Sequence, residues 1–195
     1  MGKIVVVNHV TLDGVMQSPS GLDEDRRGRF EHGGWAARNT DEVLGRFMGE
    51  RMAEGGDGAM LFGRRTYETM ASFWPKQTDG NPFTEVLNAR QKYVASRTLT
   101  APLEWENSTL LEGDVAEAVA SVKQEVDLVV LGSGDLLETL MRADLIDEWV
   151  LPIHPVVLGT GRRLFPDGVP PAALELTSTT PTTTGVIIAT YAAAS

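Results

Sequence analysis

Three short segments of the sequence join glycine, hydroxyl and arginine residues directly after apolar runs: Gly63-Arg64-Arg65-Thr66, Ser96-Arg97 and Gly132-Ser133-Gly134. Glycine allows backbone N–H groups to come close to a phosphate, and a helix that starts there adds partial positive charge. Arginine can bind phosphate oxygens with two N–H groups at once. Arginines that merely solvate a helix start would oppose the helix dipole, which makes this alternative less favourable. The three segments therefore indicate phosphate-binding sites for a nucleotide.

The composition limits the classes of function. The chain has 195 residues, a net charge of −10 and no cysteine. This length fits one domain over residues 1–195 with a substantial core. The charge argues against nucleic acid or an anionic membrane as the main partner, and the lack of cysteine excludes disulfides and thiolate metal sites. The apolar runs are too short for a signal peptide or a membrane span, so we expect a soluble, cytoplasmic protein.

Regular strands and helices are needed to position the three segments. Apolar, β-branched runs predict strands at residues 4–7, 59–62, 93–95 and 128–131, with a weaker strand at 108–111. Helices are expected from the N-caps Thr40 and Asp114, and over residues 64–72, 84–89 and 135–142. The pattern indicates one α/β domain, and in open sheets of this class ligands bind at the carboxyl ends of the strands.

The C-terminal third predicts strands of another kind. A strand over residues 148–158 contains Pro152 and Pro155, which suggests a sheet edge or a bulge. Residues 174–180 and 184–191 follow as a closing antiparallel hairpin.

A long polar stretch, residues 14–39, contains two large rings, Phe30 and Trp35. Stretches of this length without regular structure are uncommon in compact domains unless they are lids or binding loops. Two interpretations stay open: the rings cover a ligand, or they pack back on the core.

Five segments, in order along nearly the whole chain, resemble a known family. They are Thr11 to Gly14, Leu61 to Glu68, Tyr93 to Arg97, Val130 to Gly134, and His154 to Pro166. On these residues the chain is similar to the dihydrofolate reductase-like superfamily, in particular the branch with the RibD C-terminal reductase domain of riboflavin biosynthesis. The resemblance implies a three-layer α/β sandwich with a mostly parallel eight-stranded sheet, helices on both faces and a C-terminal antiparallel hairpin. It also implies NADPH as the hydride donor.

The resemblance assigns cofactor-binding roles to particular residues. Gly63, Arg64, Arg65 and Thr66 match the loop around the cofactor pyrophosphate, and Ser96 with Arg97 matches the strand end that holds the adenosine-ribose phosphate, which would favour NADPH over NADH. The glycine turn near the pyrophosphate and nicotinamide ribose matches Gly132, Ser133 and Gly134, with Leu136 in the helix that follows. Dihydrofolate reductases have a cis Gly-Gly bond at this turn, and a cis bond before Ser133 would cost more. The segment from Val10 to Gly14 matches the loop along the nicotinamide.

Candidate catalytic residues are less well defined. Dihydrofolate reductases place a carboxylate near the start of the helix after the lid, and Glu42 or Asp41 lies near that position, although plain helix-start charges explain them too. Asp13 is matched in both branches, with a turn aspartate as the alternative. By type, His9, His32 and His154 are candidate proton donors, but their spacing predicts no metal site.

The function that the resemblance implies is an NADPH-dependent reductase of a pyrimidine- or pterin-like heterocycle, similar to 5-amino-6-(5-phosphoribosylamino)uracil reductase. Arg162 or Arg163 could hold a phosphate on such a substrate. The alternatives are a dihydrofolate reductase and a nucleotide-binding module without turnover. Homodimers are plausible, since the resembling reductases pair through late strands. The run Val186 to Ala189 could supply that face, or simply belong to the core.

Overall fold

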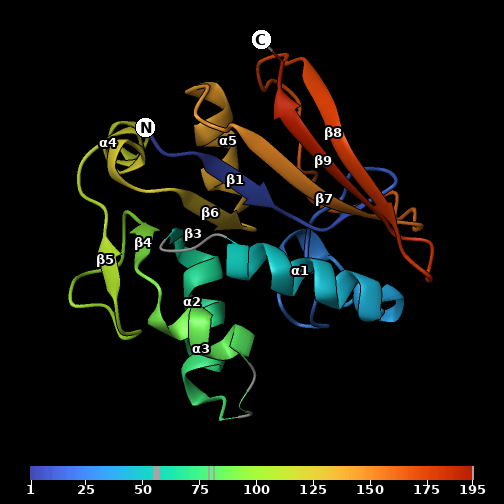
Figure 1. Cartoon of the computed structure of the whole chain (residues 1–195), viewed down its shortest axis with the longest axis horizontal. Helices are drawn as coiled ribbons and strands as arrows, with labels where there is room; N and C mark the ends of the chain where they lie inside the picture. The colour runs from blue at the N-terminus through green and yellow to red at the C-terminus, as the bar shows by residue number, and fades with distance from the viewer. Residues whose placement is uncertain (55–57, 79, 81, 195) are drawn as a thin grey trace.

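The computed structural model describes residues 1–54, 58–78, 80 and 82–194, and these build one mixed sheet flanked by helices (Figure 1). Its strands are β1 (Ile4–Val7), β2 (Val10–Thr11), β3 (Ala59–Gly63), β4 (Lys92–Ala95), β5 (Ser108–Leu110), β6 (Leu128–Leu131), β7 (Glu148–His154), β8 (Leu174–Pro181) and β9 (Ile187–Ala193). The main helices are α1 (Glu42–Glu54), α2 (Arg64–Phe73), α3 (Pro82–Ala89), α4 (Val115–Glu125) and α5 (Gly134–Arg142).

The sheet is mostly parallel, as the resemblance implied. The described strands run in the order β5-β4-β3-β6-β1-β7-β9-β8, and the short β2 continues beyond β1 alongside β7. All pairs from β5 to β7 are parallel, whereas β9 is antiparallel to both β7 and β8. The expected eight positions across the sheet and the closing hairpin are thus confirmed.

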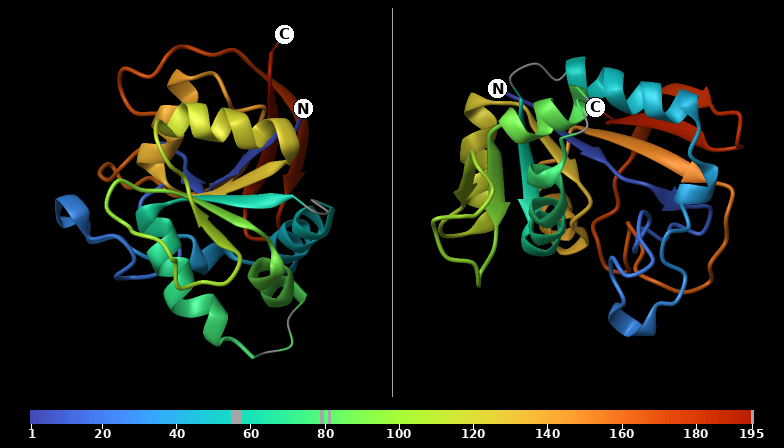
Figure 2. Two further views of the ribbon diagram at one scale, coloured as in Figure 1. Left: turned by 90° about the vertical axis from the view of Figure 1, so that its left-hand side faces the viewer. Right: turned by 90° about the horizontal axis from the view of Figure 1, so that it is seen from below.

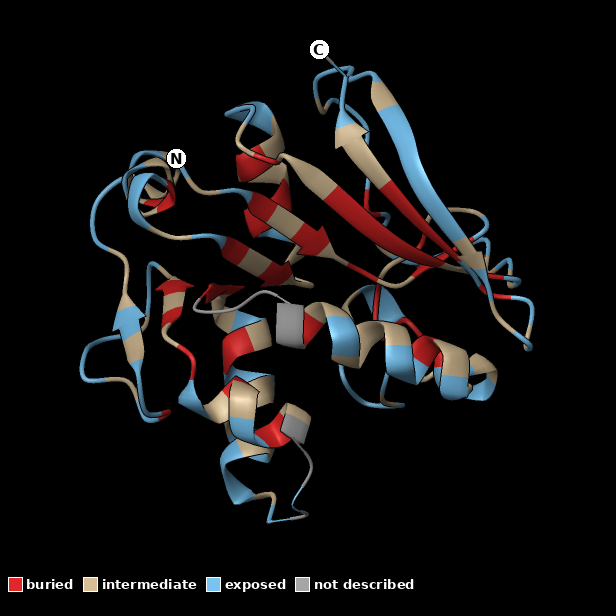
Figure 3. Cartoon of the chain, viewed as in Figure 1, coloured by how far each residue is buried: buried red, intermediate tan, exposed pale blue. Residues whose placement is uncertain are grey.

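Alternating side chains on the strands bury both faces of the sheet. In β1, Ile4 and Val6 pack with α4 and α5, whereas Val5 and Val7 pack with Leu44 of α1. Figure 2 shows α4 and α5 on one side of the sheet and α1, α2 and α3 on the other. Buried residues are concentrated in the central strands, while most of β8 is exposed (Figure 3). This is the expected three-layer sandwich.

Two helix starts were predicted from capping residues. Asp114 caps α4, since its carboxylate accepts hydrogen bonds from the backbone N–H groups of Ala116 and Glu117. For α1, the carboxylate of Asp41 accepts from Leu44 N at 2.9 Å, so the cap is Asp41 and the prediction of Thr40 was wrong by one residue. Either side chain can cap a helix, and the backbone decides which one reaches the free N–H groups.

The strand predicted over residues 148–158 is confirmed but shorter, and Pro152 marks neither a sheet edge nor a bulge. The strand β7 ends at His154, so Pro155 lies outside it, and β7 is flanked by β1 on one side and β9 on the other. Pro152 is tolerated inside the sheet because it lies opposite residues 8–9, where β1 has ended and β2 has not begun. A proline lacks the N–H that a continuous partner strand would require.

The stretch 14–39 packs back on the domain. Phe30, Trp35 and Ala36 form a buried cluster with Val15, and the indole Nε1 of Trp35 donates to the carbonyl of Gln17 at 2.7 Å. Backbone hydrogen bonds from Met16 N to Arg162 O and from Leu164 N to Gly14 O tie the stretch to the segment after β7. The interpretation of core packing therefore describes both rings.

Within the part of the chain that the structure describes, no helix has the length and apolar character needed to cross a bilayer.

Candidate functional site

A cleft of about 1010 Å³ runs along the carboxyl edge of the parallel strands. Its lining includes the residues that directly follow β4, β3, β6 and β1, which are neighbours in that order in the sheet. The three phosphate-type segments predicted from the sequence all line it, together with Leu136 of α5. The sheet order thus brings together groups that are widely separated along the chain, as the rule for open α/β sheets requires.

The turns after β3 and β6 are joined by one side chain. Ser133 Oγ accepts from the backbone N–H of Gly63 at 2.8 Å and donates to Thr66 Oγ1 at 2.8 Å. Gly132 has φ +64° and Ser133 has φ +72°, so a non-glycine residue is held in the left-handed region, at a cost of roughly 1–2 kcal/mol. Among the described residues the cis peptide bond is Ala101-Pro102, and the Gly132-Ser133 bond is trans.

The glycine at the end of β3, Gly63, is explained by the close approach of the Ser133 side chain and not by an unusual backbone conformation. A Cβ on Gly63 would meet the Ser133 side chain at 3.2 Å, which is tighter than ordinary contact. The helix α2 then starts with Arg64 and has neither a side-chain cap nor an acidic residue in its first turn. Its first N–H groups and positive dipole end are therefore left for a ligand.

The end of β4 presents a third cationic group to the cleft. Ser96 Oγ accepts from the backbone N–H groups of Thr98 at 3.1 Å and Leu99 at 3.0 Å, which fixes the turn after the strand. Arg97 is exposed at this turn. Among the described residues, Arg64, Arg65 and Arg97 form no ion pair with a carboxylate. These guanidinium groups are therefore available to an anionic ligand.

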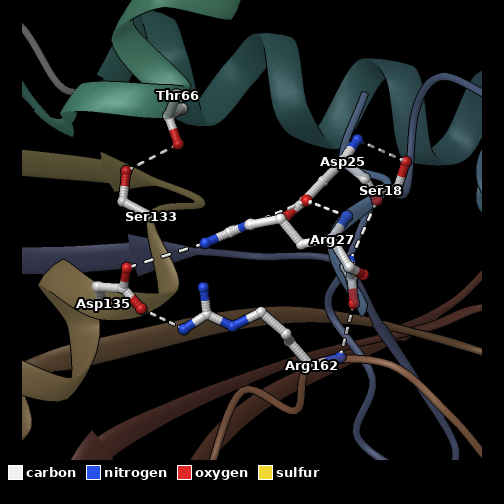
Figure 4. A network of polar contacts seen from close by, with 8 residues as sticks. Ser18, Asp25, Arg27, Thr66, Ser133, Asp135 and Arg162 are labelled. Atoms are coloured by element: carbon white, nitrogen blue, oxygen red, sulfur yellow. Dashed lines mark hydrogen bonds and ion pairs between the residues drawn. The ribbon is translucent and has the colours of Figure 1, made fainter. Parts of the chain in front are cut away.

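Across the cleft, an ionic network connects three chain segments (Figure 4). Asp135, in the first turn of α5, pairs with Arg162 and lies 4.0 Å from Arg27. Arg27 also makes a bidentate pair with Asp25, at 2.9 and 2.6 Å. The hydrogen bond from Arg162 lowers the pKa of Asp135, and that from Arg27 lowers the pKa of Asp25. Both carboxylates are thus held ionised between arginines.

The end of the cleft at β1 is neutral. Asn8 and His9 line it in the break between β1 and β2, and the Nδ1 of His9 lies 2.8 Å from the Nε2 of His154 at the end of β7. Burial lowers the pKa of both rings to about 4, and the neighbouring His154 contributes to the shift of His9. Both imidazoles are therefore uncharged at pH 7.

Two of the predicted cofactor-binding residues lie elsewhere. Val10 is buried in the core from β2, and Gly14 forms a turn with φ +78°; neither is among the residues that line the cleft. In their place, Asn8 and His9 occupy the strand end. The sequence signal is the pair of polar residues that follows the apolar run of β1; of these, His9 was considered by its type as a proton donor, and Asn8 was not considered.

The two candidate catalytic carboxylates also lie away from the cleft lining. Asp13 accepts from Thr11 Oγ1 at 2.6 Å and from the backbone N–H of Gly159 at 2.8 Å. The hydrogen bond from Thr11 lowers the pKa of Asp13, and these contacts match a turn aspartate. Glu42 is exposed in the first turn of α1, and Asp41 accepts from the backbone N–H and hydroxyl of Thr183. Their catalytic roles stay predictions without support from this geometry.

The residues of the cleft suit a dinucleotide phosphate better than a metal. The structure describes no group of three or more His, Asp or Glu side chains with metal-binding geometry. By contrast, neither α2 nor α5 has a side-chain cap at its start. The missing Cβ of Gly63 also leaves room for the side chain of Ser133 between the two helix starts. Uncapped N–H groups flanked by guanidinium groups are the donor set that a pyrophosphate needs.

Comparisons with known proteins agree with this architecture. YyaP of Bacillus subtilis, an uncharacterised protein, is 27% identical over 97% of this chain and 94% of its own length. The structure of a protein from Shewanella described as a putative riboflavin biosynthesis protein aligns with TM-score 0.71 and 21% identity, covering 99% of both chains. A pyrimidine reductase-like protein of Corynebacterium diphtheriae aligns with TM-score 0.68 and 10% identity, covering 100% of this chain and 92% of the other.

The sequence profile of the RibD C-terminal domain matches residues 2–188, which is nearly the whole chain. The three phosphate-type segments of the chain meet at the edge of the sheet where the resemblance to this family predicted a nicotinamide cofactor. The chain is therefore a member of the RibD C-terminal domain family, which is a family of reductases.

Proposed function

We propose that this protein is an NADPH-dependent reductase of a pyrimidine-like heterocycle. The observation that carries the proposal is the order of chemical groups along the cleft. From β4 to β1 they are the Arg97 guanidinium, the Gly63 and Ser133 turns, and the neutral Asn8-His9 pair. Three inter-strand spacings of about 4.8 Å separate the two ends, roughly 14 Å in all, which fits an extended dinucleotide.

Each group along this line has a distinct role in binding. The two turns would hold the pyrophosphate with backbone N–H groups, and Arg64 and Arg65 would balance its charge. Arg97 would pair with the ribose phosphate that distinguishes NADPH from NADH. When bound, the dihydronicotinamide supplies a hydride. At the β1 end, Val7 and the α1 residue Met48 line the cleft and would keep water away from the reacting ring.

The heterocycle is better described as pyrimidine-like than as a pterin. Recognition of a pterin by a helix carboxylate would need an acidic α1 side chain in the cleft, but α1 contributes Met48 to the lining. Asp41 is engaged in capping α1 and in binding Thr183. The cation for a substrate phosphate would be Arg162 or Arg27, both of which line the cleft. Dihydrofolate is thus the second candidate substrate.

A homodimer remains part of the proposal, but Val186 to Ala189 would contribute little to its interface. Val186, Ile188 and Ala189 are buried within the chain itself, and β9 is covered on both edges by β7 and β8. The exposed edge strand β8 is the more suitable face.

The test is a titration of purified protein with NADPH and, separately, with NADH, followed by quenching of tryptophan fluorescence. We expect tighter binding of NADPH, and Arg97→Gln should weaken NADPH by about 10-fold with little effect on NADH. Arg46→Gln, an exposed arginine of α1 outside the cleft, is the matched control. Equal affinity for both cofactors would refute the role of Arg97, and absence of binding would refute the reductase. NADPH that binds but is oxidised by neither pyrimidine-like nor pterin acceptors would favour a binding module.

A further inference from the structure

The break between β1 and β2 holds a pair of histidines that the phosphate-binding groups leave unused. His154 is fully buried, and its ring lies edge-on to Trp35 at a centroid distance of 5.2 Å. Its Nε2 contacts His9 Nδ1, while its Nδ1 is buried without a hydrogen-bond partner among the described residues. No carboxylate of the described residues lies within hydrogen-bonding distance of either ring.

These contacts select one arrangement of protons. Two neutral imidazoles joined through one hydrogen bond have two choices of donor. If His9 donated, His154 would have to carry its proton on Nδ1, leaving a buried N–H without an acceptor. If His154 Nε2 donates, the bare Nδ1 lone pair is left instead. Orphaned buried N–H groups are the rarer case in proteins, so the second arrangement is favoured.

The consequence is an N–H donor directed to the cleft. With its Nδ1 accepting from His154, the neutral His9 ring must carry its proton on Nε2. This nitrogen has no partner among the described residues and, unlike His154 Nδ1, is not enclosed by protein. His9 lines the cleft, so a ligand there would meet a donor whose direction is fixed from behind by His154.

The preceding residue adds a second polar group to the same place. Asn8 is 5% exposed and lines the cleft, and its Nδ2 is buried without a hydrogen-bond partner in the described structure. Nδ2 is enclosed by protein like His154 Nδ1, whereas Oδ1 is not among the enclosed unpaired atoms of the described residues. The carboxamide therefore offers a ligand in the cleft its Oδ1 as a hydrogen-bond acceptor.

We propose that Asn8 and His9 recognise the lactam edge of a neutral six-membered ring, with His154 as the positioning residue that sets the tautomer of His9. A lactam presents a carbonyl acceptor beside an N–H donor, which complements the carboxamide of Asn8 and the N–H of His9. The role rests on the proposed function, because it identifies the ring class that the reductase would take. An uncharged site also avoids burying an ion near a neutral ring.

The tautomer can be measured directly, without any ligand. The chain has three histidines, and His32 is exposed, so His32→Gln in ¹⁵N-histidine-labelled protein leaves two sets of imidazole signals. Long-range ¹H–¹⁵N spectra at pH 7 should show both remaining rings protonated on Nε2. A signal from His9 protonated on Nδ1 would overturn the proposal. Because this spectrum uses the native side chains, it does not depend on whether a variant of the buried His154 folds.

Ligand recognition is tested with uracil as the probe on NADPH-saturated protein, with 1,3-dimethyluracil as the probe that keeps both carbonyls and lacks the N–H groups. Uracil should shift the Nε2 signals of His9, and the dimethyl compound should bind about 10-fold more weakly. Asn8→Leu and His9→Phe should each weaken uracil by about 5- to 10-fold, measured on protein that is kept saturated with NADPH so that a change in cofactor affinity does not enter the comparison. NADPH binding without any shift of His9 by uracil would overturn the recognition role alone. Failure to bind NADPH would instead refute the proposed cofactor, and the tautomer measurement would still decide the histidine pair.

Discussion

The side chain of Ser133 links the turn after β6 to the turn after β3, and substitutions of this residue measure how much the link contributes to the free energy of unfolding. The residue combines two opposing effects: it makes two hydrogen bonds, and it occupies a backbone conformation that disfavours any residue except glycine. Substitution by alanine removes the hydrogen bonds and keeps the unfavourable conformation. Substitution by glycine removes the hydrogen bonds and the conformational cost together.

The magnitudes follow from the contacts. Loss of Ser133 Oγ leaves the backbone N–H of Gly63 without its acceptor and removes the bond to Thr66, so Ser133→Ala should lower the free energy of unfolding by about 2–3 kcal/mol. Ser133→Gly should lower it by roughly 1 kcal/mol less, because glycine adopts φ +72° without strain. Both variants should weaken NADPH, because the turns lose their common anchor.

Urea unfolding at pH 7, followed by tryptophan fluorescence, measures both differences. Ser72→Ala is a control, since Ser72 is exposed and its hydroxyl donates to Thr69 O within its own helix α2. If Ser133→Gly proved as destabilising as Ser133→Ala, the assigned backbone strain would be wrong. If neither variant differed from the wild type in its free energy of unfolding, the hydrogen bonds of Ser133 between the two turns would not contribute to stability.

Three further predictions test other parts of the structure. Asp135→Asn should tighten NADPH by about 2- to 5-fold, because it removes a negative charge from the first turn of α5, next to the proposed pyrophosphate site. It should change stability by less than about 1 kcal/mol, and Asp167→Asn, outside the cleft, should leave the NADPH affinity unchanged in the same titration. The pKa values of His9 and His154 are each lowered from 6.5 to about 4, so the unfolded chain binds more protons than the folded chain between these limits. Urea unfolding should therefore show about 5 kcal/mol of stability lost as pH falls from 6.5 to 4, and His9→Gln should reduce this loss whereas His32→Gln should not. Lys92→Met should cost about 3 kcal/mol in the same assay, because the buried ammonium donates to three backbone carbonyls, and a cost below 1 kcal/mol would contradict that role.

The fold was largely predictable because local pattern and global arrangement agree. The apolar runs of β1, β3, β4 and β6 are short and bounded by polar or glycine residues, and each became a strand of the parallel sheet. The prediction of a sheet edge or a bulge at Pro152 was wrong because the sequence shows only that a proline lacks a backbone N–H. Its tolerance depends on the gap opposite it between β1 and β2, which is a property of another strand.

The candidate site was predictable where backbone chemistry decides, and less so where side chains converge. Glycine turns after strands mark phosphate cradles locally, so Gly63 and Gly132 could be named from the sequence. The contact of His9 with His154 joins residues 145 positions apart, and no local pattern encodes it. The same holds for Arg27 and Asp135, whose pairing depends on how residues 14–39 fold back over the sheet edge.

The distribution of charge explains how a strongly acidic chain can offer a site for an anion. The net charge is −10, from 17 basic and 27 acidic residues. Yet the described residues that line the cleft include six arginines and five carboxylates, and three of those carboxylates, Asp25, Asp135 and Glu138, already pair with arginines. The acidic excess therefore lies outside the cleft, where solvent and salt screen it within about 8–10 Å. Inside, the unpaired guanidinium groups of Arg64, Arg65 and Arg97 act at short range on whatever the two helix starts hold, while the β1 end, with Asn8 and His9, stays neutral. A ligand that is anionic at one end and uncharged at the other is thus oriented in a single direction along the edge of the sheet.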